Sequence, residues 1–167
     1  MKNRAPIDFL LILIVYLACA GLIYGAVTMD WPTDDLGVKL GTDPHTHQQY
    51  QIKDFEGDYG TWCAVTGGVS LLCAFAWYIL GEWGPRANKL SSGTWTFIWL
   101  ALLMVTIAVG IVAVISDPEA EAIDNSWILT LSYMLWGPGF FFIATVLFSP
   151  VNTKFIVPGS SVVRRGW

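Results

Sequence analysis

Three residues whose types and spacing suit metal chemistry lie in one polar stretch, Asp43-Pro44-His45-Thr46-His47. In extended backbone, side chains two positions apart point the same way, so His45 and His47 could reach one ion. Asp43 or a neighbouring acid would supply a third ligand, and imidazole with carboxylate suits zinc or copper. The pattern predicts a candidate metal site. The simpler interpretation is a solvated loop with two unrelated histidines.

The three cysteines, Cys19, Cys63 and Cys73, lie among apolar residues and lack the spacing of a metal site. Their odd number also argues against a disulfide framework. We interpret them as small packing residues, with a Cys19–Cys63 bridge as the less favoured alternative.

The elements that must position these residues are four runs without any charged side chain, at 9–29, 61–81, 95–115 and 127–148. Hydrophobic residues make up 54% of the 167 residues and charged residues only 13%. A helix rises about 1.5 Å per residue, so runs of this length match a hydrocarbon core about 30 Å thick. The sequence predicts an all-α membrane protein, a single domain over 1–167 with four transmembrane helices joined by short loops.

The first run has a basic start and a possible cleavage site at Ala18-Cys19-Ala20, as a signal peptide would. It nevertheless stays apolar to Met29, beyond that site. We therefore expect a retained helix.

The connecting segments differ sharply in charge. One side carries seven of the nine basic residues, namely Lys2, Arg4, Arg86, Lys89, Lys154, Arg164 and Arg165. Because basic residues in short loops stay in the cytoplasm, both termini and the 149–167 tail are predicted there, with 30–60 as an outer acidic loop. The basic start and the lack of an N-glycosylation triplet favour a bacterial inner (plasma) membrane.

Small residues form stripes on two of the predicted helices. Ala18, Gly21 and Gly25 share one face of the first, and Ala64 and Gly68 lie four apart on the second. Such stripes let helix backbones approach closely within lipid. They are predicted to pack the four helices together, with contact to another subunit as the alternative.

The fourth run is interrupted near its middle by Gly137-Pro138-Gly139. Pro138 cannot donate a hydrogen bond to the carbonyl of Met134, and the glycines weaken the helix further, so a kink is predicted. A broken helix can also line a binding cavity. Trp136 lies unusually deep, and its N–H needs a freed carbonyl, a neighbouring subunit, or a bound lipid or cofactor.

The four runs contain no Asp, Glu, Lys, Arg or His. Proton relays, ion-coupled carriers and voltage sensors normally place ionisable residues within the membrane, and haem in a bundle is usually held by histidines on the spans. The chain also lacks a phosphate-binding glycine loop, a nucleophile elbow, a zinc-protease helix and a nucleic-acid surface. No enzyme class is indicated.

These features favour a non-catalytic integral membrane subunit that packs into a larger respiratory, secretion or transport complex. Its partners would be other integral membrane subunits and the lipid bilayer, with no nucleic acid. One alternative is a self-assembled small channel or facilitator. Another is a metal-handling membrane protein that uses the outer-loop histidines, and a bound lipid remains a candidate ligand.

Overall fold

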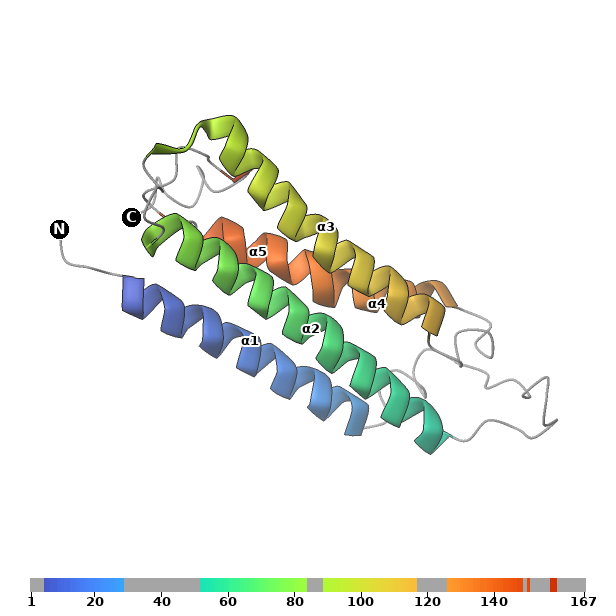
Figure 1. The fold of residues 1–167 in the computed structure, drawn as a ribbon. Helices are drawn as coiled ribbons and strands as arrows, with labels where there is room; N and C mark the ends of the chain where they lie inside the picture. The colour runs from blue at the N-terminus through green and yellow to red at the C-terminus, as the bar shows by residue number, and fades with distance from the viewer. Residues whose placement is uncertain are drawn as a thin grey trace.

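The computed structural model describes residues 5–28, 52–83, 89–116, 126–148, 150 and 157–158. Within these ranges the regular elements are helices, and none is a strand. In chain order they are α1 (Ala5–Thr28), α2 (Ile52–Trp83), α3 (Ser92–Ser116), α4 (Ser126–Met134), the π-helix η2 (Leu135–Gly139) and α5 (Phe140–Leu147). The last three follow one another without a break, so they form one helical rod (Figure 1).

Three stretches of the described helices are long and apolar enough to cross a membrane: Tyr59–Trp83, Ser92–Ser116 and Thr130–Leu147. The apolar stretch described in α1, Leu10–Gly21, is shorter. An all-helical chain with membrane-spanning segments is the architecture that the sequence predicts.

Helix α2 begins at Ile52, well before the apolar run that starts at 61. Its early turns contain Asp54, Glu56 and Asp58. Part of the segment predicted as an outer loop is therefore helical.

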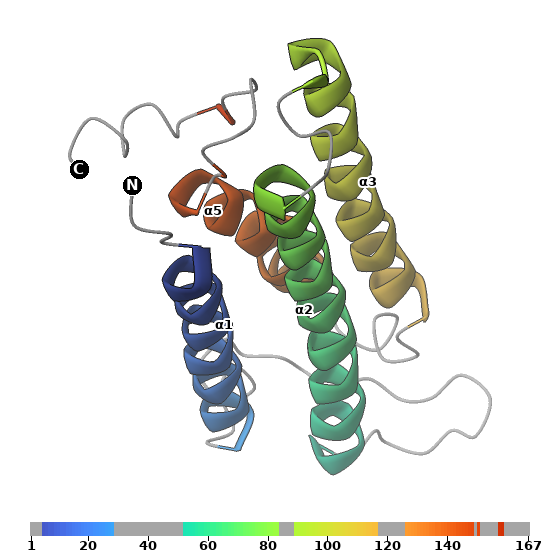
Figure 2. The ribbon, with the colours of Figure 1, turned by 60° about the vertical axis from the view of Figure 1, so that its left-hand side comes forward.

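Helix α2 is the centre of the bundle. It packs against α1 on one side and against α3, η2 and α5 on the others (Figure 2). Helix α3 also packs along α4 and η2. Helix α1 rests mainly on α2, while the ring of Tyr16 additionally meets Phe140 of α5 at 6.0 Å between centroids.

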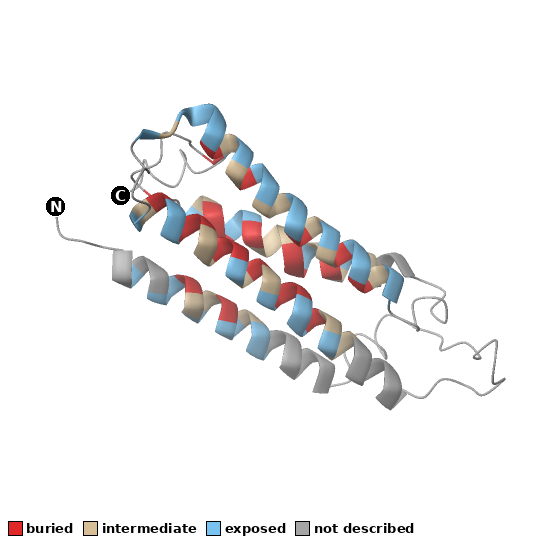
Figure 3. Ribbon diagram, viewed as in Figure 1, coloured by how far each residue is buried: buried red, intermediate tan, exposed pale blue. Residues whose placement is uncertain are grey.

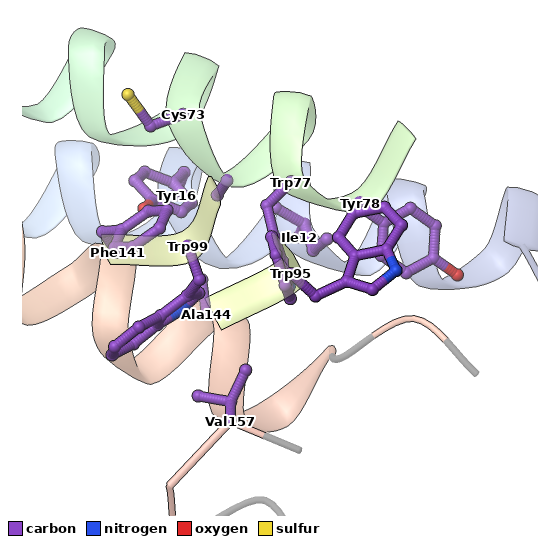
Figure 4. Packing of buried hydrophobic residues seen from close by; sticks show 11 residues of the cluster. Ile12, Tyr16, Cys73, Trp77, Tyr78, Trp95, Trp99, Phe141, Ala144 and Val157 are labelled. Atoms are coloured by element: carbon purple, nitrogen blue, oxygen red, sulfur yellow. The ribbon is translucent and has the colours of Figure 1, made fainter. Parts of the chain in front are cut away.

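Two clusters of buried side chains form the core, and buried and exposed positions alternate along the helices (Figure 3). Many large apolar side chains also face outward. The larger cluster is rich in aromatic residues and contains Ile12, Tyr16, Cys73, Ala74, Trp77, Tyr78, Trp95, Trp99, Phe141, Ala144 and Val157 (Figure 4). The smaller cluster contains Cys63, Ala113, Tyr133 and Trp136. Val157 lies beyond α5, so the chain returns to the bundle after its last helix.

Candidate functional site

The predicted metal ligands Asp43, His45 and His47 lie outside the described residues, so that site stays a prediction. Among the residues that the structure does describe, no group of three His, Cys, Asp or Glu side chains could hold a metal ion. Cys19, Cys63 and Cys73 are free thiols, and the latter two are buried.

The small-residue stripes lie on exposed surface. Ala18 and Gly21 are exposed on α1, and Ala64 and Gly68 are exposed on α2. A Cβ atom added to Gly21 or Gly68 would meet nothing within 4 Å. The surroundings of Gly25 are outside the described side chains. The four described positions are thus available to something other than this chain.

Close packing inside the bundle uses other glycines. A Cβ on Gly67 would meet the indole of Trp136, at 2.5 Å from Nε1 and 2.8 Å from Cε2. A Cβ on Gly110 would lie 3.3 Å from Cε of Met134, and one on Gly137 would lie 3.4 Å from the carbonyl oxygen of Thr106. The site built by these contacts is the crossing of α2, α3 and η2.

Trp136 is the central side chain of this crossing. Its indole N–H donates to the backbone carbonyl of Cys63 on α2, and its ring lies against Gly67. The ring of Phe140 also contacts the indole edge-on, at 4.6 Å between ring centroids. The partner of the deep indole is therefore a carbonyl of a neighbouring helix of the same chain.

The π-helix gives η2 a wider turn than an α-helix. The N–H of Phe140 donates to two carbonyls, that of Gly137 three residues back and that of Leu135 five residues back. The turn contains Pro138, which has no N–H to contribute. A Cβ on Gly139 would lie 3.3 Å from the carbonyl oxygen of Met134, so a small residue suits this position.

The wide turn also aligns the buried face of the rod. Tyr133, Gly137 and Phe141 are all buried and lie four residues apart. An α-helix turns about 100° per residue, so a spacing of four drifts by about 40° at each step. A π turn rotates less per residue, which cancels much of this drift. The two halves of the rod therefore bury Tyr133 and Phe141 on the same side of the rod, each in its own cluster.

Other buried polar groups also have partners on neighbouring helices. The hydroxyls of Tyr16 on α1 and Ser70 on α2 are 2.7 Å apart, and the indole N–H of Trp99 on α3 donates to Thr145 Oγ1 on α5 at 3.1 Å. The hydroxyl of Thr145 donates in turn to the carbonyl of Phe142 at 3.0 Å. An unmet polar group is costly in an apolar interior, so these bonds stabilise one arrangement of the helices.

The sequence marks Trp136 and Pro138 as unusual, but the small-residue stripe that it indicates on the second helix contains Gly68 and not the neighbouring Gly67. Only Gly67 faces the bundle. The buried position that could have separated them is Ser70, three residues after Gly67 and on the same face. Comparison with protein-family models, with curated protein sequences and with solved structures finds no match.

Proposed function

We propose that this chain is a non-catalytic integral membrane subunit that packs into and stabilises a larger membrane protein complex of the respiratory, secretion or transport kind. The observation that carries the proposal is the exposure of Ala18, Gly21, Ala64 and Gly68. The chain packs its own helices through different positions, so these faces remain free for another backbone.

Within lipid, apolar surface alone does not drive helices together, because the acyl chains are as apolar as the side chains. Close approach of two backbones supplies dispersion contact instead, and small residues permit it. Gly21 and Gly68 have open space where a side chain would be. The partners expected there are helices of other integral membrane subunits, with lipid covering the bulkier faces.

Among the described residues, the buried polar side chains are hydroxyl groups that carry no charge. The buried polar side chains are Thr66, Ser70, Thr106 and Thr145. Thr66, Thr106 and Thr145 donate to carbonyls of their own helices, and Ser70 pairs with Tyr16. Groups arranged in this way support the fold, which fits a structural subunit better than a carrier.

Helix α1 completes a bundle of four spans in this proposal. Its 24 residues extend about 36 Å at a rise of about 1.5 Å per residue, enough for a hydrocarbon core of about 30 Å. The basic residues then place both termini in the cytoplasm, in a bacterial inner membrane. The fourth span bends at Pro138, where the helical hydrogen-bond ladder lacks a donor.

The test is purification from native membranes in mild detergent, followed by mass spectrometry of what comes with the tagged chain. Unrelated membrane subunits in fixed stoichiometry are expected. The double variant Gly21→Leu, Gly68→Leu should lose them severalfold, because leucine keeps a neighbouring backbone away. Ala108→Leu, which adds the same kind of bulk to an exposed position of α3, is the matched control and should retain them.

A wild-type chain that leaves the membrane alone and monomeric would contradict the proposal. A symmetric assembly of identical chains would favour a channel or facilitator instead. Stoichiometric zinc or copper would point to the outer-loop histidines.

A further inference from the structure

The wide turn at η2 holds one residue more than an α-helical path would need. The N–H of Phe140 is shared between the carbonyls of Gly137 and Leu135, whereas in an α-helix it would donate to the carbonyl of Trp136. Closing the turn would rotate α4 against α5 by about 100° and shift it by about 1.5 Å along the axis. Relative to α5, each residue of α4 would then move into the location that the residue before it occupies in the wide turn.

Trp136 belongs to the part that would rotate. In the observed arrangement its indole occupies the space that Gly67 leaves by having no side chain, and its N–H bonds to the Cys63 carbonyl. A rotation of about 100° would carry the indole off this surface and break that bond. The contact with α2 therefore favours the wide turn.

Pro138 affects both the wide and the closed turn. It lacks an N–H, so no hydrogen bond from residue 138 is lost when the turn closes. In a closed turn its ring would press against the Met134 carbonyl, and the helix would bend to relieve the contact. The wide turn and the bent α-helix are thus two ways for one rod to contain the same proline.

We propose that η2 is a joint with two registers, and that Trp136 seated against Gly67 holds α4 in the observed one. Nine residues, 117–125, separate α3 from α4, a long connection relative to a shift of about 1.5 Å. The joint lets the half of the rod formed by α4 change its lipid-facing residues while α5 keeps its place. It requires no partner, so it stands or falls separately from the subunit proposal.

Neighbouring positions on α4 report the register. Leu131 is 60% exposed and Ser132 is half-buried in the wide register. In the closed register Ser132 takes the place of Leu131, so the order of exposure reverses. On α5, Ile143 is exposed and Ala144 is buried, and their order should not change.

The experiment uses the full chain in lipid nanodiscs, with its three cysteines replaced by alanine and one spin-labelled cysteine at 131, 132, 143 or 144. The Cys63→Ala replacement keeps the acceptor of the indole, which is a backbone carbonyl. Oxygen accessibility of the nitroxide is measured for the otherwise unchanged chain and for Gly67→Ala, whose added Cβ collides with the indole. Gly68→Ala is the matched control, because a Cβ there meets nothing within 4 Å.

We expect accessibility at 131 to exceed that at 132 in the otherwise unchanged chain and in Gly68→Ala, and the order to invert in Gly67→Ala. The order at 143 and 144 should persist throughout. Trp136→Leu, which empties the contact instead of overfilling it, should give the same inversion. The proposal is overturned if 131 stays ahead of 132 in both test variants, or if the α5 pair also loses its order. It is equally overturned if both variants fail to fold while Gly68→Ala folds, because the contact would then be a requirement of the fold.

Discussion

Tyr16, Trp99 and Trp136 each carry a polar group into an apolar interior, and each group bonds to a helix other than its own. Tyr16 pairs with Ser70, Trp99 with Thr145, and Trp136 with the Cys63 carbonyl. The pairs join α1 to α2, α3 to α5, and η2 to α2. They act as fixed points of register, because sliding either helix would separate donor from acceptor.

The Tyr16–Ser70 pair allows a quantitative test at this scale. Tyr16→Phe and Ser70→Ala should each destabilise the fold, and the double variant should cost less than the sum. The coupling should be about 0.5–1.5 kcal/mol, the range of a single hydrogen bond. The measurement is the free energy of unfolding in mixed detergent micelles. Fully additive costs would show that the two hydroxyls do not support each other.

The sequence indicates some of these residues and not others. A buried indole N–H needs a hydrogen-bond acceptor, so the sequence predicts that Trp136 has one. Its supplier is a backbone carbonyl, which every residue possesses, so no residue type marks Cys63. Choosing Gly67 over Gly68 requires the face of α2 that meets η2, and this depends on contacts between segments far apart in the chain.

At the scale of the elements, the apolar runs predict where the helices lie. They do not predict the residues at which the helices begin and end. The runs at 61–81 and 95–115 lie within α2 and α3. Hydropathy does not predict the earlier start of α2, because a helix can extend beyond its apolar run where its own hydrogen bonds and charges permit. The π turn was not anticipated either. Pro138 predicts a kink, which stays a prediction, and the missing donor is also compatible with the wider turn that the packing of Trp136 favours.

Two glycines lie where α3 meets the rod of α4, η2 and α5, and replacing each by alanine should change stability differently. At Gly110 the nearest atoms belong to the flexible end of Met134, which can move aside. Gly110→Ala should therefore raise stability by up to about 1 kcal/mol, the gain of alanine over glycine within a helix.

At Gly137 the nearest atom is the carbonyl oxygen of Thr106, held by the backbone of α3. Gly137→Ala should gain less stability than Gly110→Ala, because the backbone oxygen that its Cβ would touch cannot turn away. Both changes are measured as shifts of the unfolding midpoint in detergent. Equal shifts for the two variants would show that the flexibility of the neighbour does not decide the outcome.

At the scale of the whole molecule, charge and packing describe different properties. Packing fixes which helices meet, with α2 at the centre and α1 at the edge. Charge predicts which ends face the cytoplasm, since seven of nine basic residues lie on one side of the predicted spans. The sequence thus predicts the class of the fold, whereas the pairing of helices needs the three-dimensional structure.

The predicted orientation is tested with single cysteines in a cysteine-free background. Asp35→Cys should react with a membrane-impermeant maleimide on intact cells. Asn88→Cys should react only after the membrane is permeabilised. Labelling at 88 from outside would reverse the orientation, and labelling of both positions from outside would remove one span from the count.

The contact between Trp136 and Gly67 also sets an order in time. The ribosome adds residue 136 to the chain 69 residues after residue 67. At about 5–20 residues per second, the second helix waits for about 3–14 s before the ribosome delivers the indole that covers it. During that interval α3 and α4 are synthesised while the Gly67 surface still lacks the indole, and this part of the core is complete only when η2 has been added.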